Sequence, residues 1–215
     1  ATTSDNRLVF ARYLREESFI SGDIETELEF STQQAFSGDI TSIVLTPSLN
    51  HLYAASKDGV LLDYSLDEEG FDGDLRPYQF SEEISQLKLL LGGDSLLVGL
   101  NNGEVQQWMS VRKESGRELT FIRKFQNGSM PAISIATEQQ RKGFAVADTK
   151  GEVTLYYSTS QRTLAHINTV NYPIAQMAWS ARAQNLIAVD NDDRIHLYSI
   201  HNEYPEISWD VLWGK

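Results

Sequence analysis

Apolar and polar residues alternate in short runs along the chain, and the runs follow tight turns at regular intervals. The clearest unit spans residues 148–157, in which a turn at Thr149, Lys150 and Gly151 is followed by Glu-Val-Thr-Leu-Tyr-Tyr. Side chains of a strand switch faces at every residue, so strict alternation around a glycine turn is typical of a β-hairpin. This unit therefore predicts two antiparallel strands joined at Gly151.

The same unit occurs three more times. With Gly151 as the reference position, the equivalent residues are Gly59, Gly103 and Asp193. Each copy has an aliphatic residue two positions later and an aromatic residue five positions later. The aliphatic residues are Leu61, Val105, Val153 and Ile195, and the aromatic residues are Tyr64, Trp108, Tyr156 and Tyr198.

Two further apolar strands are expected before each turn. An apolar pair stands seven and five positions before the reference, at Leu52/Ala54, Leu96/Val98, Phe144/Val146 and Leu186/Ala188. Another stands nineteen and sixteen positions before it, at Ile40/Ile43, Ile84/Leu87, Ala132/Ile135 and Ile174/Met177. The references are 44, 48 and 42 residues apart, and this variation falls after the aromatic residue, where an outer fourth strand would lie. Four strands per period of this length indicate a β-propeller blade, most similar to the WD-repeat kind.

We therefore predict an all-β fold, a WD40-like β-propeller forming a single domain over residues 1–215. Four full blades are expected at 39–82, 83–130, 131–172 and 173–215, and residues 1–38 supply a half blade with only the third and outer strands, the latter over 25–36, for 18 strands in all. Leu52, Leu96, Phe144 and Leu186 are predicted to be buried, and Tyr64, Trp108, Tyr156 and Tyr198 to pack between blades. Polar segments at 67–74, 112–117 and 126–129 are expected to be loops between blades.

The opening of the chain in mid-blade leads us to expect a fragment of a larger propeller. The sequence begins Ala-Thr-Thr-Ser-Asp without a Met or an apolar leader, which resembles a boundary inside a longer protein. A half blade leaves strand edges without partners, and such edges favour association, so the fragment is expected to dimerise through them.

Composition excludes several classes of function. The chain has no cysteine, which excludes disulfides and thiolate metal sites. Its net charge is −12, and residues 1–82 hold 16 acidic and 5 basic residues. Such a surface repels phosphate backbones, so nucleic acid is not expected as a partner. We interpret the acidic side as a solvated face, with a docking surface for a basic partner as the alternative.

Two acidic clusters invite a metal hypothesis, and neither has the required spacing. Residues 67–74 contain five carboxylates but lack the alternation of a calcium-binding loop, so we interpret them as a solvated loop. Asp190, Asp192 and Asp193 fall on the predicted inter-strand turn, which such side chains stabilise. The histidines are His51, His166, His196 and His201, and they occupy different blade positions without helical i, i+4 spacing, so no zinc site is expected.

No catalytic pattern is present in the sequence. The glycines at Gly92, Gly93 and Gly99 do not have the intervals of a phosphate loop or a dinucleotide fingerprint, and there is no nucleophile elbow. The tryptophans, Trp108, Trp179, Trp209 and Trp213, are interpreted as packing residues. We therefore predict that the chain is not an enzyme and has no catalytic, cofactor-binding or metal site.

The last blade adds a resemblance beyond the fold. Residues 175–180 (Ala-Gln-Met-Ala-Trp-Ser), 194–199 (Arg-Ile-His-Leu-Tyr-Ser) and 203–215 (Glu-Tyr-Pro-Glu-Ile-Ser-Trp-Asp-Val-Leu-Trp-Gly-Lys) resemble the region before the membrane core of the enlarged permease subunits of bacterial phosphate ABC transporters. In that family a WD-like domain is inserted after the first transmembrane helix.

The resemblance implies an accessory domain that faces the periplasm at the inner membrane. Its partners would be other transporter subunits or periplasmic proteins, and it would have no catalytic role of its own. None of the family's transport residues has a match here, so none is assigned. A stand-alone WD-type interaction scaffold and a propeller enzyme or ligand-binding domain remain the alternatives.

Overall fold

The computed structural model describes residues 2–34, 38–114, 116–126, 128, 130–168, 172–201 and 206–213. In these ranges the chain forms strands and turns and no helix, so no helix there has the length and hydropathy needed to cross a bilayer. The strands form one two-stranded and four four-stranded antiparallel sheets, and each strand pairs with its neighbours in sequence. This arrangement confirms the predicted all-β fold with four four-stranded blades.

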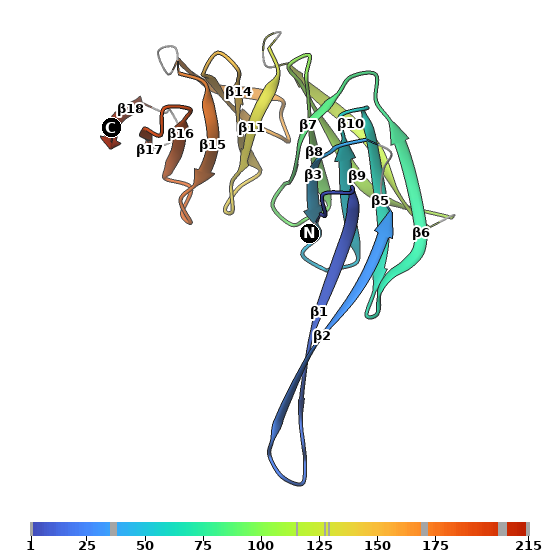
Figure 1. The fold of residues 1–215 in the computed structure, drawn as a ribbon. Coiled ribbons are helices and arrows are strands. Elements are labelled where there is room, and N and C mark those ends of the chain that lie inside the picture. Colours follow the sequence, from blue (N-terminus) through green and yellow to red (C-terminus); the bar gives the residue numbers. More distant parts are fainter. Residues whose placement is uncertain are drawn as a thin grey trace.

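The blades follow one another along the chain in an open arc (Figure 1). The two-stranded sheet consists of β1 (Arg7–Glu17) and β2 (Ile24–Gln34). The first blade contains β3 (Ile40–Leu45), β4 (His51–Ser56), β5 (Val60–Asp67) and β6 (Gly70–Gln79), and the second contains β7 (Ile84–Leu89), β8 (Ser95–Leu100), β9 (Glu104–Lys113) and β10 (Gly116–Gln126). The third contains β11 (Ala132–Thr137), β12 (Gly143–Asp148), β13 (Glu152–Tyr157) and β14 (Arg162–Asn168), and the fourth contains β15 (Ile174–Trp179), β16 (Asn185–Asp190), β17 (Ile195–His201) and β18 (Glu206–Trp213).

The reference position of the repeat is fixed by backbone conformation. Gly59, Gly103 and Gly151 have φ angles of 73°, 83° and 84°, and Asp193 at the same position has a φ of 61°. This left-handed conformation is readily adopted by glycine and tolerated by aspartate and asparagine. The turn between the second and third strands therefore has the same geometry in all four blades.

Two of the three predicted inter-blade loops were assigned to the wrong place. Residues 67–74 contain the turn between β5 and β6 and the start of β6, and residues 112–117 contain the turn between β9 and β10, so both lie inside a blade. An outer strand is exposed along much of its length, so its polar sequence resembles a loop; β6 shows this burial pattern. Of the third segment, Gln126 ends β10, and Asn127 and Ser129 lie outside the described residues.

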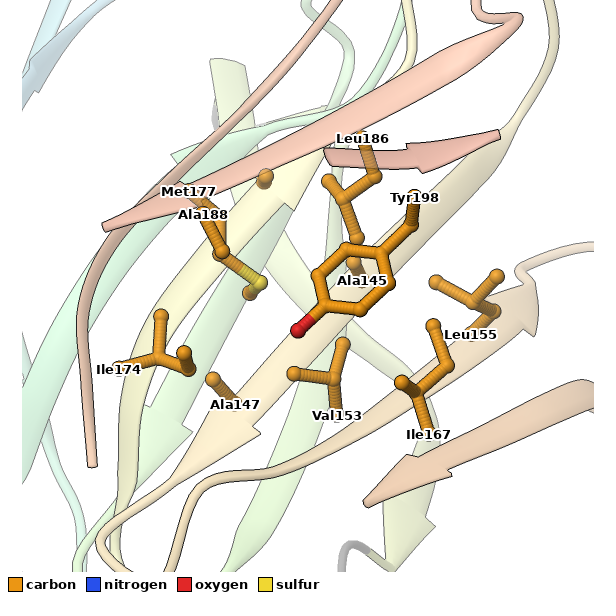
Figure 2. Close-up of a cluster of buried hydrophobic side chains, with 11 residues drawn as sticks. Ala145, Ala147, Val153, Leu155, Ile167, Ile174, Met177, Leu186, Ala188 and Tyr198 are labelled. Carbon is orange, nitrogen blue, oxygen red and sulfur yellow. The ribbon is translucent and has the colours of Figure 1, made fainter. Parts of the chain in front are cut away.

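Each blade has two apolar faces, which we name by their direction along the chain. The leading face points to the next blade and carries the side chains six and four positions before the reference and two positions after it. The trailing face points to the preceding blade and carries those seven and five positions before it and five after. Figure 2 shows one contact of this kind, in which Tyr198 on the trailing face of the fourth blade lies among Ala145, Val153 and Leu155 of the third.

The predicted core positions follow this scheme with one exception. Leu96, Phe144 and Leu186 are buried, as are Tyr64, Tyr156 and Tyr198, and Trp108 is partly buried against Phe80. Leu52 is only half-buried, together with Ile40 and Ile43 on the same trailing face. The two-stranded sheet packs on the outer part of this blade, so the inner strands of this trailing face have no complete sheet against them.

The β1–β2 hairpin is anchored at its base and projects away from the blades (Figure 1). Leu8 is fully buried in the cluster that includes Tyr64, and the Phe10 ring packs edge-on against Phe71 at 6.2 Å. The Arg12 guanidinium donates to the carbonyl of Glu68 and forms an ion pair with Glu29. These contacts fix the first half of β1, and the far half of the hairpin extends into solvent.

Candidate functional site

A polar cavity lies between the first and second blades and is built around His51. Two adjacent hollows of about 340 and 450 Å³ share His51 and Arg117 in their walls. The first is also lined by Asp63 of β5 and by Asp74 and Arg76 of β6. Arg76 can reach this position because Gly116, with a φ of 106°, has no Cβ; a Cβ there would lie 3.1 Å from Arg76 Nη2.

The His51–Asp63 pair is the most chemically distinctive feature of this cavity. His51 Nδ1 lies 2.8 Å from Asp63 Oδ1, and both side chains are largely buried. With Nδ1–H donating to the carboxylate, a neutral imidazole keeps its lone pair on Nε2. In the described part of the chain, no hydroxyl is hydrogen-bonded to this imidazole. The cavity can therefore bind polar groups, but it lacks the nucleophile–base pair that covalent catalysis requires.

Tyr53 packs beneath this histidine and keeps its proton. The two rings are parallel, with centroids 6.1 Å apart. Burial, reinforced by the negative charge of Asp63, raises the pKa of the Tyr53 phenol well above its ordinary value. The residue therefore has a packing role and is not a proton donor or acceptor near neutral pH.

A second His–Asp pair lies buried in the fourth blade. His196 Nε2 is 2.8 Å from Asp190 Oδ2, and the backbone amides of Asp192 and Arg194 each donate to Asp190 Oδ1 at 2.9 Å. Burial raises the pKa of Asp190, but the hydrogen bonds from His196 and the two amides outweigh it, so the net pKa is below the ordinary value. The pair holds the turn, as predicted for Asp190, but the sequence analysis missed the role of His196.

The signal for this pair was present in the repeat register. Asp190 and His196 stand three positions before and three positions after Asp193, so the hairpin places them close together across the turn. The third blade has the same turn bonds, in which the amides of Lys150 and Glu152 donate to Asp148 Oδ1. There Thr154 takes the place of the histidine.

The far half of the β1–β2 hairpin is the largest exposed apolar feature in the described residues. Phe19 and Ile20 at its tip are fully exposed, and four more large apolar side chains of the hairpin are more than half exposed; these are Tyr13, Ile24, Leu28 and Phe30. Acidic residues flank the tip at Glu16, Glu17 and Asp23. The sequence analysis assigned these strands to a half blade and did not predict the projection, although the two strands are 11 residues long, well above the usual five or six.

The structure was compared with known proteins. No family model matches the chain, and no curated protein matches it. Solved propeller structures do match. The RRP9 WD40 repeats superpose with a TM-score of 0.69 at 14% identity, covering 84% of this chain and 52% of that one. The chain has the WD40-propeller fold.

Two further structures agree with this assignment. The β-propeller domain of Cps50 (Swd1) from Myceliophteria thermophila matches with a TM-score of 0.69 at 16% identity over 81% of this chain and 60% of that one. U3-55K matches with a TM-score of 0.68 at 14% identity over 83% and 53%. The chain thus spans between about half and three fifths of the length of these WD40 propellers, and the low identities establish the fold alone.

The WD40 fold separates the candidate metal ligands from one another. In the described residues no three histidine or acidic side chains gather in a group that could hold a metal. His166 Nδ1 lies 3.1 Å from the Thr154 hydroxyl, far along the chain from His51 and His196, and the side chain of His201 lies outside the described residues.

The carboxylates of residues 67–74 are used locally. Asp67 accepts from the amide of Glu69 and Asp72 from that of Asp74, each at 2.8 Å. Asp74 also forms an ion pair with Arg76 at 3.2 Å. These bonds shape the β5–β6 hairpin and leave the segment without a common centre for a cation.

The described tryptophans pack within and between blades, as predicted. Trp108 contacts the rings of Tyr78, Phe80 and Phe121. Trp179 Nε1 donates to the carbonyl of Ala136 in the preceding blade at 3.1 Å. The side chains of Trp209 and Trp213 lie outside the described residues.

Proposed function

We propose that this chain is a non-catalytic protein-docking module. The observation that carries the proposal is the projecting β1–β2 hairpin, whose tip holds Phe19 and Ile20 fully in solvent. Isolated apolar side chains are common on protein surfaces, but adjacent, fully exposed aromatic and aliphatic residues at the end of a projecting element are suited to insertion into a partner. A propeller is a rigid base from which such an element can be presented.

The charges beside the tip specify the chemistry of the partner. Glu16, Glu17, Asp23 and Glu25 lie within a few residues of Phe19, with no base closer than Arg15. An apolar tip with acidic flanks fits an apolar pocket rimmed by basic side chains. The same charges disfavour insertion into an anionic lipid surface.

The non-catalytic part of the proposal rests on the cavity around His51. The imidazole there is hydrogen-bonded to Asp63, but no hydroxyl of the described residues is hydrogen-bonded to it as a nucleophile. The other buried pair, Asp190 and His196, is fully engaged in holding a turn.

We further propose that the module belongs to a phosphate importer at the bacterial inner membrane and faces the periplasm. This proposal is supported by the sequence resemblance over residues 175–180, 194–199 and 203–215, of which 203–205 and 214–215 lie outside the described residues. The parent protein would be membrane-embedded, and the partner of the tip would be another transporter subunit or a periplasmic protein. The parent reading frame tests this: a frame that encodes no hydrophobic multi-span region after residue 215 would overturn it.

Site-specific photo-cross-linking in the parent protein tests the docking role. A photoreactive residue at position 19 is expected to give one discrete cross-linked partner in cells, because Phe19 would lie inside the partner's pocket. The same residue at position 122, on the outer strand of the second blade, serves as the control. The double variant Phe19→Ser, Ile20→Ser should prevent co-purification of that partner without a change in folding. If position 19 gives no adduct beyond those at position 122, the proposal is wrong.

A further inference from the structure

The leading face of the fourth blade is apolar and lacks the cover that every other leading face has. Ile187 stands six positions before the reference, and the equivalent residues in the first three blades are Tyr53, Leu97 and Ala145. Those three are 2%, 0% and 0% exposed, whereas Ile187 is 38% exposed. The difference arises because each of the three packs on the blade that follows it.

The neighbours of Ile187 make this face continuous. Ile187 pairs with Leu197 and Val189 pairs with Ile195 across β16 and β17, so the four side chains share one face of the sheet. Val189, Ile195 and Leu197 are also only partly buried. An aliphatic surface of this kind is the surface that the other blades use to bind a trailing face.

The second open face is the trailing face of the β1–β2 hairpin. Opposed residues of antiparallel strands point to the same side, and Tyr13 is opposite Leu28 while Ala11 is opposite Phe30. Tyr13, Leu28 and Phe30 are 62%, 57% and 66% exposed. The opposite side of this hairpin carries Leu8 and Phe10, which already pack on the first blade.

The chain thus carries at its two ends the two halves of a blade-to-blade contact, and both halves are uncovered. We propose that they bind each other between copies of the chain, with the Ile187 face of one copy against the Tyr13–Leu28–Phe30 face of the next. The occupant is a second copy because each of the three contacts inside the chain joins a leading face to a trailing face. The contact is heterologous, so it builds closed rings or open chains of copies.

This association is separate from the proposed docking role of the tip. It uses apolar faces that contain no charged side chain among Ile187, Val189, Ile195 and Leu197, so added salt should not weaken it. Docking through Phe19 and Ile20 is flanked by acids and should weaken with salt. The two proposals can therefore fail independently.

Complementation between two variants tests the heterologous contact. Leu28→Glu blocks the trailing face and Ile187→Glu blocks the leading face, so each variant alone should sediment as a monomer while the wild type forms larger species as concentration rises. An equimolar mixture should form a one-to-one dimer, because the intact leading face of the first variant meets the intact trailing face of the second. The mixture also shows that both variants are folded.

The matched control is Ile122→Glu, which changes the same residue type at 37% exposure on an outer strand and should assemble like the wild type. Phe19→Ser with Ile20→Ser should also leave assembly unchanged. Three results would overturn the proposal: a wild type that stays monomeric at all concentrations, a mixture that stays monomeric, or an Ile187→Glu variant that still dimerises. The last result would show that hairpins pair with hairpins.

Discussion

Phe144 offers the most direct test of the contact between blades. Its side chain is 1% exposed on the trailing face of the third blade. The ring packs edge-on against Phe125 of the second blade at 4.9 Å between centroids and stacks on Tyr156 at 5.3 Å. Phe144→Ala removes both ring contacts and leaves a cavity between two rigid sheets, which cannot easily move together to fill it.

The expected loss is about 3–5 kcal/mol of unfolding free energy, the usual range for truncating a buried phenylalanine. The two ring contacts favour the upper half of the range, since aromatic pairs add about 0.5–1.5 kcal/mol beyond their buried area. For a domain of this size about 1 kcal/mol corresponds to about 2–4 °C in Tm, so the shift should be about 6–20 °C.

Urea unfolding followed by far-UV circular dichroism, together with thermal melts, measures this loss. Phe19→Ala is the matched control, because it makes the same chemical change at a fully exposed position and should alter stability by no more than about 0.5 kcal/mol. Equal effects of the two variants, or a loss below about 1 kcal/mol at Phe144, would refute the assignment of Phe144 to a packed contact between blades.

Three other predictions concern the turn, the buried phenol and the fold. Asp190→Ala should destabilise the fourth blade by about 1–3 kcal/mol, because it leaves His196 and two amides without their acceptor; Asp192→Ala, whose carboxylate is exposed, should be near neutral in the same denaturation assay, and equal losses would contradict the assigned role. Burial, with a contribution from Asp190, raises the pKa of Tyr198 from 10.0 to about 12, so its contribution to stability is complete below pH 10.0 and is lost as pH rises toward about 12. Stability measured across that range should therefore fall less steeply in Tyr198→Phe than in the wild type, and identical slopes would exclude the effect. Far-UV circular dichroism should show a β-type spectrum, and a dominant helical signal would contradict the fold.

Local sequence determined the blades. Alternation of apolar and polar residues sets which strand face is buried, and this is a property of neighbouring residues that no distant contact has to supply. The left-handed turn at Gly59, Gly103 and Gly151 is local as well, because glycine adopts it without a steric cost. These two signals, repeated with a period in the forties, were sufficient for strand order and for the core residues Leu96, Phe144 and Leu186.

The tertiary structure decided which of these apolar faces are covered. Ile187 and Leu97 occupy the same position of the repeat, yet one is exposed and the other is buried, because burial depends on whether another blade stands opposite. The pairing of His51 with Asp63 and the projection of the β1–β2 hairpin likewise depend on how separate strands meet in space. Alternation specifies that a face is apolar, but the partner of that face comes from a part of the chain, or from another molecule, that the local pattern does not encode.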